Sequence, residues 1–308
     1  MSKLSLSPHI HSGMSTGGIM LDVVIALLPA AVAGVVIFGL SALWVILTCV
    51  ASSVIFEALF CLITKKPQSV KDFSAVVTGL LLALNLPASI PLWQCVVGSL
   101  FAIIVVKCLF GGLGQNVVNP AIAARVFMLV AFSSMTQAAF PVDAVAGATP
   151  LADTGNLPDL LTLFIGYHGG AIGETCAAAL LLGGLYLMAR RVITWHNPVC
   201  FMGTVFVFSL FMEGFDPLRA LSMVLCGGVI LGAIFMATDY TTSPVTHGGQ
   251  IAFGIGCSVL TIALRYFGSY PEGVSYAILI MNCCVGFFDK IGIPKRFGLK
   301  KKRGGEAK

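Results

Sequence analysis

The feature that most constrains this chain is a series of apolar runs, each about 20 residues long. A helix of about 20 residues crosses the roughly 30 Å of hydrocarbon in a bilayer. A membrane β-barrel would instead show alternating segments of about 10 residues. Only 10% of the residues are charged, whereas a soluble domain has about 25%. The sequence therefore predicts an all-α integral membrane protein.

Ten transmembrane helices are predicted from the apolar runs. The first run is too long for the apolar part of a signal peptide and is not followed by a clear cleavage site, so it counts as a helix. The third and seventh helices are short and are interrupted by Pro or Gly. The ten ranges are 18–40, 41–64, 73–88, 92–110, 121–138, 170–190, 198–213, 217–237, 249–268 and 272–289.

The basic residues indicate the orientation of these helices. With the N-terminus in the cytoplasm, 16 of the 18 Lys and Arg residues fall on the inner side, and only Arg219 and Arg265 fall outside. We therefore expect both termini in the cytoplasm and the loop 139–169 on the outer face. The basic tail 290–308 is either a solvated anchor or a docking segment for an acidic partner. The outer loops hold the acidic residues Asp143, Asp153, Asp159, Glu213, Asp216 and Glu272.

The chain also resembles itself at an offset of about 125 residues, where Pro91-Leu92 and Pro217-Leu218 each open a helix. Five helices in each half would make the two halves face opposite ways. Inverted repeats with broken helices place a binding or conduction site between the halves. The expected parts are an N-terminal segment 1–17, a first repeat 18–138, an outer loop 139–169, a second repeat 170–289 and a tail 290–308.

Two polar connections, Gly111–Pro120 and Thr238–Gly249, interrupt the helices. They are either cytoplasmic turns or loops that dip into the bundle and line a cofactor or ion cavity. Free N–H groups and helix N-termini there would suit an anion such as a flavin phosphate. The candidate binding residues are Asn116, Asn119, Arg125 and Asp239, with Thr241 and Thr242 as further polar groups.

An acidic residue inside a membrane is a functional candidate. Glu57 lies about seven residues, or roughly 10 Å, from the inner end of the second helix. It is either paired with Lys107 or Arg125, or part of an ion or proton relay. Asp22 and Glu174 are expected at the membrane interfaces.

The ten cysteines and five histidines do not have the spacing of a metal site. No cysteine pair has C-x-x-C spacing, and nearly all cysteines fall inside predicted helices, where they are expected to pack as small apolar residues. The one cluster, Cys283-Cys284, points about 100° apart on a helix and is a poor metal pair by itself. A cluster shared with a partner subunit stays open.

Four segments, in order along the chain, resemble one family. They are Ser7-Pro8-His9, GGLGQNVVNPAIAAR (111–125), DAVAGATPL (143–151) and TDYTTSPVTHGGQ (238–250). Together they resemble RnfD (also called RsxD), the D subunit of the Rnf ion-translocating electron transport complex. A more distant relative is NqrB, the B subunit of the sodium-pumping NADH:quinone reductase. The resemblance covers essentially the whole chain.

The resemblance implies an FMN bound covalently, as a phosphoester, to the threonine of an S/A-G-A-T motif. In this chain the acceptor is Thr149, and Asp143, Gly147 and Ala148 surround it. Many family members have Ser where this chain has Ala146. The local chemistry agrees, because Thr149 supplies a hydroxyl and the following proline holds it in an extended conformation. A flavin transferase is implied for maturation, and a second, non-covalent flavin such as riboflavin stays open.

Two functions are compatible with these patterns. The first is an FMN-carrying subunit of a complex that couples electron transfer between ferredoxin and NAD to Na⁺ or H⁺ translocation. Its implied partners are the A, B, C, E and G subunits of the Rnf complex and the lipid bilayer, with no nucleic acid. The chain lacks a dinucleotide fingerprint and Fe–S cysteine spacing, so it is not a complete enzyme alone. The second is a stand-alone inverted-repeat transporter or channel for a small solute, which would not need a flavin acceptor.

Overall fold

The computed structural model describes residues 15–132, 135, 158–268 and 273–291. Within these ranges the secondary-structure elements are all helices, as predicted. Each of the ten predicted helices has a helical counterpart, and a further short helix, α6, falls in the range predicted as the outer loop.

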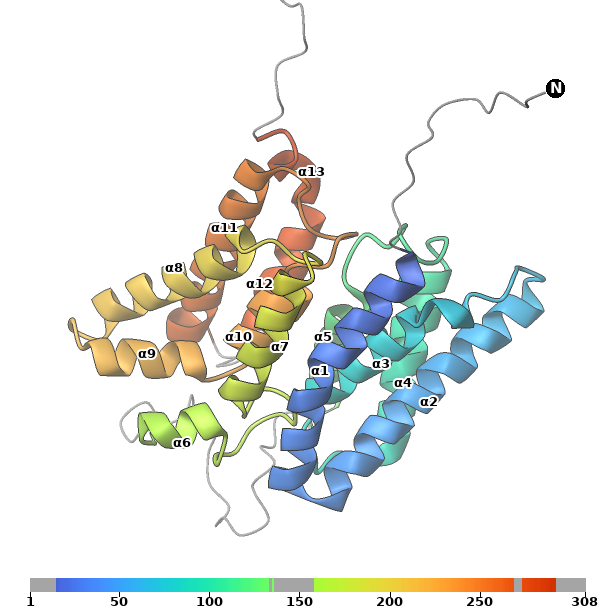
Figure 1. Cartoon of the computed structure of the whole chain (residues 1–308), viewed down its shortest axis with the longest axis horizontal. Coiled ribbons are helices and arrows are strands. Elements are labelled where there is room, and N and C mark those ends of the chain that lie inside the picture. The colour runs from blue at the N-terminus through green and yellow to red at the C-terminus, as the bar shows by residue number, and fades with distance from the viewer. Residues whose placement is uncertain (1–14, 133–134, 136–157, 269–272, 292–308) are drawn as a thin grey trace, which may run out of the picture.

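The described part of the first half forms five longer helical segments and the short 3₁₀ helix η1 (Figure 1). Ser15 begins the first of them, because its Oγ accepts a hydrogen bond from the backbone N–H of Gly18. The fourth segment starts as an α-helix and continues as a π-helix. The elements are α1 (Thr16–Phe38), α2 (Leu40–Ile63), the short η1 (Val70–Asp72), α3 (Ser74–Leu84), α4 (Leu92–Leu100) with η2 (Phe101–Cys108), and α5 (Pro120–Ala131).

The second half is divided into more and shorter helices. The elements are α6 (Leu160–Ile165), α7 (Ala177–Ala189), α8 (His196–Met212), α9 (Pro217–Leu225), α10 (Val229–Leu231) with the π-helix η4 (Gly232–Met236), α11 (His247–Phe267), α12 (Val274–Cys283) and α13 (Val285–Phe288). In Figure 1 this yellow-to-red half lies beside the blue-to-green first half. The halves meet where α1 packs on α7 and α5 packs on α12.

Length and composition support a membrane location. Among the described residues, α1, α2 and α11 are long and apolar enough to cross a bilayer, and α9 with α10–η4 makes a fourth candidate bent by 63°. Large apolar side chains also face outward, including Val36 at 73% exposure and Val130 at 74%. Exposing such side chains to water costs free energy, whereas contact with lipid tails does not.

The interruptions of the helices differ from the prediction. The seventh predicted helix is continuous as α8, because Pro198 falls in its first turn, where a proline removes no helical hydrogen bond. The eighth is broken instead. Gly227 and Gly228 have φ angles of +68° and +70° and separate α9 from α10. This left-handed conformation is open to glycine at little cost.

A buried, non-helical segment precedes α7. The prediction of helix from residue 170 is wrong, because α7 begins at Ala177. Residues 168–175 are instead buried without helical structure and bond to the chain that follows α3. The backbone N–H of Ile172 donates to the carbonyl of Leu86 (3.0 Å), and that of Gly173 donates to Leu84 (2.8 Å). These bonds satisfy backbone groups that could not stay unpaired inside a membrane protein.

Candidate functional site

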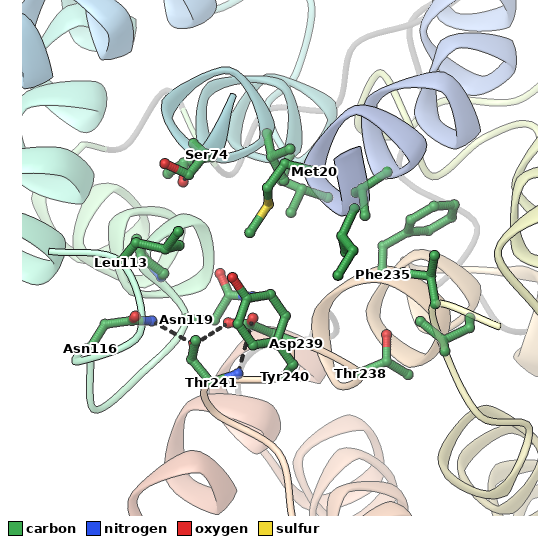
Figure 2. Close-up of a pocket in the computed structure, with 18 of the residues that line it drawn as sticks. Met20, Ser74, Leu113, Asn116, Asn119, Phe235, Thr238, Asp239, Tyr240 and Thr241 are labelled. Carbon is green, nitrogen blue, oxygen red and sulfur yellow. Dashed lines mark hydrogen bonds between the residues drawn. The ribbon is translucent and has the colours of Figure 1, made fainter. Parts of the chain in front are cut away.

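A cavity lies between the two halves of the chain. Its walls come from α1, α3, α7, η2, η4 and the two polar connections (Figure 2). Met20, Leu113 and Phe235 give it apolar surface, while Ser74 and Lys107 bring polar groups from the first half. Ligand cavities commonly combine apolar walls with a few placed polar groups.

The first polar connection is tied to the second half by two asparagines. The side chain of Asn119 caps α5, because its Oδ1 accepts from the N–H of Ala121 (3.0 Å), while its Nδ2 donates to the carbonyl of Met236 (3.4 Å). Asn116 Nδ2 donates to Thr241 Oγ1 at 3.1 Å. Figure 2 shows this bond at the cavity wall. The two connections therefore line one cavity, and a cofactor or ion in that cavity stays a prediction.

Asp239 is the carboxylate of the second connection. Its Oδ2 accepts from the hydroxyls of Thr241 (3.0 Å) and Thr242 (3.2 Å), and its Oδ1 accepts from the N–H of Thr241 at 3.4 Å. Removal from water raises the pKa of Asp239, and the hydrogen bonds from the two threonines oppose that rise. Asp239 thus offers a hydrogen-bond acceptor at the cavity wall.

Glu57 and Lys107 form a buried ion pair beside the cavity. Lys107 Nζ donates to Glu57 Oε2 (2.9 Å) and to Ser74 Oγ (2.7 Å), while Ser69 Oγ donates to Glu57 Oε1 at 2.5 Å. The two charged side chains are 3% and 2% exposed. The predicted pairing of Glu57 is therefore confirmed for Lys107, and a role in an ion relay stays a prediction.

Other predicted residues lie elsewhere. Arg125 lies outside the cavity lining, and its Nη1 donates to Asn85 Oδ1 at 2.5 Å. Thr149, with Asp143, Gly147 and Ala148, lies outside the described residues. The site that the structure describes is therefore the cavity of the two connections and not the flavin acceptor loop.

The membrane-interface positions expected for Asp22 and Glu174 stay a prediction, and the structure shows both residues buried in the protein. Asp22 is 7% exposed, and it accepts from Arg190 Nη2 (3.2 Å) and from Tyr186 Oη (2.9 Å). These contacts join α1 to α7 at the border between the halves. Glu174 is 4% exposed and lies in the buried segment before α7. A helical span from residue 170 would have placed it near a helix end, but the segment is folded inward.

The sequence did not place several cavity residues at the site. Lys107 was considered only as a partner of Glu57, although a charge inside an apolar run (Phe101–Cys108) is itself a signal. Met20 and Ser74 carried none, since an apolar residue and a small hydroxyl are ordinary in a membrane helix. Within the described ranges, no group of three His, Cys, Asp or Glu side chains could hold a metal ion.

Comparisons with known proteins give the family. The profile of the NQR2, RnfD, RnfE family matches residues 3–298. The chain is 50% identical to the D subunit of the Na⁺-translocating ferredoxin:NAD⁺ oxidoreductase complex of Acetobacterium woodii, over 97% of this chain and 96% of that one. It is 40% identical to the D subunit of the proton-translocating ferredoxin:NAD⁺ oxidoreductase complex of Clostridium ljungdahlii, over the same shares. The D subunit of an ion-translocating oxidoreductase complex of Stutzerimonas stutzeri is 38% identical over 92% of both. On this near-complete match, the chain belongs to the NQR2, RnfD, RnfE family.

Proposed function

We propose that this chain is the D subunit of an Rnf-type membrane complex that couples electron transfer between ferredoxin and NAD to the translocation of Na⁺ or H⁺. The observation that carries the proposal is the 50% identity to such a subunit over nearly the whole of both chains. The apolar outer surface, and a cavity between the halves with apolar walls and a few polar groups, fit a membrane subunit that handles a cofactor. The chain acts as part of an oxidoreductase complex and not as a complete enzyme.

We also propose that Thr149 carries FMN as a phosphoester. The sequence Ala146-Gly147-Ala148-Thr149-Pro150 supports this, because it offers a hydroxyl on a backbone with little steric cover. A bound FMN would exchange electrons with the other redox centres of the complex. A flavin transferase would attach it, and the A, B, C, E and G subunits would supply the other centres.

We propose further that this cavity binds a second, non-covalent flavin such as riboflavin. Met20 and Phe235 would cover the apolar faces of a flat aromatic ring. Asn116, Asp239 and Thr241 would hydrogen-bond its polar edge. The residues present therefore suit a flavin, with this chain's part being to bind and orient it.

The arrangement of helices supports two inverted five-helix repeats at an offset of about 155 residues. The starts of α2 and α8 (Leu40, His196), of α4 and α11 (Leu92, His247), and of α5 and α12 (Pro120, Val274) differ by 154 to 156 residues. The two contacts between the halves that join α1 to α7 and α5 to α12 then each join a helix to its own equivalent. This register pairs α4 with α11, whereas the sequence match at about 125 residues pairs it with α9.

An odd number of helices in each half gives the halves opposite directions. The distribution of basic residues then puts both termini in the cytoplasm of a bacterial cell and the loop 139–169 on the outer face. Electrons that enter the complex from the cytoplasm would have to cross the membrane to reach a flavin on Thr149. A flavin in the cavity between the halves would accept these electrons before the flavin on Thr149 does.

A tagged form of the chain, purified from its own membranes, tests the proposal. The tagged chain should co-purify with the other subunits. The purified complex should show a flavin spectrum and catalyse electron transfer between ferredoxin and NAD. Denaturation should release a non-covalent flavin from wild type but less from Asn116→Leu, whose side chain cannot donate to a flavin edge. A colourless protein that purifies alone would instead support a stand-alone transporter.

A further inference from the structure

Glu174 has a carboxylate oxygen that the fold leaves open. The side chain is 4% exposed, and its Oε1 accepts from the backbone N–H of Ala171 at 3.0 Å. Its Oε2 is buried without a hydrogen-bond partner among the described residues. A buried carboxylate in this state is costly unless a proton or another cation joins it. The oxygen is therefore a candidate acceptor for a cation.

Three non-helical stretches meet around this oxygen. Glu174 lies in the buried segment 168–175, which bonds to the chain after α3 through Ile172 and Gly173. On the other side, Oε2 lies 2.8 Å from the position that a Cβ on Gly228 would take, at the break between α9 and α10. Irregular backbone at membrane depth occurs where it is packed in protein or lines a site, and broken helices commonly form the ion sites of transporters.

Two further polar atoms of the same segment are buried and have no hydrogen-bond partner in the described part of the chain. They are Thr175 Oγ1 and His168 Nε2, on side chains that are 0% and 7% exposed. A hydroxyl and an imidazole nitrogen can each donate or accept a hydrogen bond. The segment thus brings an open carboxylate, a hydroxyl and an imidazole into the interior.

Fixed positive charges lie close to the open oxygen. Arg125 Nη1 is 3.9 Å from the same Cβ position on Gly228 and is held by Asn85. Arg265 donates from Nη2 to the carbonyls of Cys226 (2.9 Å) and Gly227 (3.2 Å) at the helix break. These guanidinium groups weaken the attraction of a mobile cation to Glu174. A site that takes part in conduction must bind its ion weakly enough to release it.

We propose that Oε2 of Glu174 is a binding position for the monovalent cation that the complex translocates, either a proton or Na⁺. The inference rests on the proposed function, because it assumes that the complex moves a cation. It assigns this chain a part in the ion path, at the helix break of the second half and apart from the Glu57–Lys107 pair. Arg125 and Arg265 act as tethered charges that keep the affinity low.

The test is cation uptake by the purified complex in sealed proteoliposomes, measured per electron transferred. Glu174→Gln keeps the size of the side chain but removes its charge, and it should lower uptake about tenfold or more while electron transfer and flavin content persist. The matched control is Glu213→Gln, which removes a carboxylate paired with Arg219 and Tyr266. The control should stay within about twofold of wild type. Uptake by Glu174→Gln within that same range would overturn the inference.

Glu174→Asp is the second variant, for the case that Glu174→Gln does not assemble. Glu174→Asp keeps a carboxylate but shortens the side chain by one methylene, which moves the carboxylate away from the proposed site. The cation concentration for half-maximal uptake should therefore rise severalfold. An unchanged value would overturn the inference. A site for Na⁺ predicts uptake of radioactive sodium that stops in choline buffer, whereas a proton site predicts internal acidification that continues there. A wild-type complex that transfers electrons without any uptake would instead refute the proposed function.

Discussion

Glu57 and Glu174 are both buried carboxylates, but their surroundings differ. Glu57 lies on α2 in the first half and has a partner on each oxygen, Ser69 on Oε1 and Lys107 on Oε2. Glu174 lies on non-helical backbone in the second half, with a backbone N–H on Oε1 and no hydrogen bond to Oε2 from the residues that the structure describes. The side chains are almost equally buried, at 2% and 4% exposure. Burial alone therefore does not separate them.

The difference shows how a membrane protein can use one residue type in two ways. A carboxylate that is fully paired with a lysine has little to gain from a mobile ion, because its charge is already neutralised at 2.9 Å. The Glu57–Lys107 pair joins α2 to η2 and lies beside the cavity, so it shapes a site without being open to an ion. Glu174 keeps one acceptor available, and its arginine neighbours bind other groups.

Breaking the Glu57–Lys107 pair should have the largest effect on stability. Lys107→Met removes the cation but leaves the carboxylate of Glu57 buried, with Ser69 as its remaining partner. The expected loss is about 3–5 kcal/mol of unfolding free energy. The amount of folded complex in the membrane and its thermal midpoint in detergent measure the effect.

The double variant Glu57→Gln/Lys107→Met sharpens this prediction. It removes both charges together, so it should recover most of the loss. A double variant as damaged as Lys107→Met would show that the lysine contributes through Ser74 and packing, and that the pair is not what holds α2 to η2.

Gly228→Ala should have the next largest effect, because it fills the space in front of Glu174. The residue has φ +70°, and the new Cβ would lie 2.8 Å from Oε2. The left-handed conformation alone costs an alanine about 1–2 kcal/mol. Thermal midpoints should therefore fall, and cation uptake should fall with them.

Gly203→Ala is the matched control. Gly203 lies inside α8, where a Cβ would meet no atom of the described residues within 4 Å. An alanine there should stabilise the helix by up to about 1 kcal/mol. If Gly228→Ala and Gly203→Ala destabilise the protein equally, residue 228 does not need a left-handed backbone conformation.

The smallest effect is expected at the Asp22–Arg190 pair between α1 and α7. The Arg190 side chain is 59% exposed, unlike Lys107 at 3%. Exposed pairs contribute about 0–1 kcal/mol, so Arg190→Gln should change the thermal midpoint little. If Arg190→Gln lowers the stability as much as Lys107→Met does, the exposure of the two ion pairs does not predict their contribution to stability.

The positions of the helices could be predicted from the sequence, because apolar runs report directly on burial in lipid. The pairing of Glu57 with Lys107 was one of two options, and the polar connections supplied Asn116, Asn119 and Asp239. These predictions rest on the local sequence, because a polar residue beside a Gly- or Pro-containing interruption of an apolar run can be recognised without knowledge of the tertiary structure. Thr149 came from the resemblance to a family and not from a pattern.

The buried position of Glu174 could not be predicted in the same way. Residues 168–175 are mostly small and apolar, which suits a helix and a buried loop equally. What decides between them is pairing with Leu84 and Leu86, far away in the chain. The break in the second half had a signal in the pair Gly227-Gly228, but its consequence, space for a carboxylate oxygen, depends on tertiary contacts.

Fluorescence of the covalent flavin tests the central claim, that this chain is an FMN-carrying subunit, most directly. The complex is denatured, its subunits are separated on a gel and the band of this chain is examined under ultraviolet light. Wild type and Glu57→Gln should both fluoresce, since Glu57 is not a flavin acceptor. Thr149→Ala should be dark, because no hydroxyl remains to form the phosphoester. Fluorescence that survives Thr149→Ala would contradict the account.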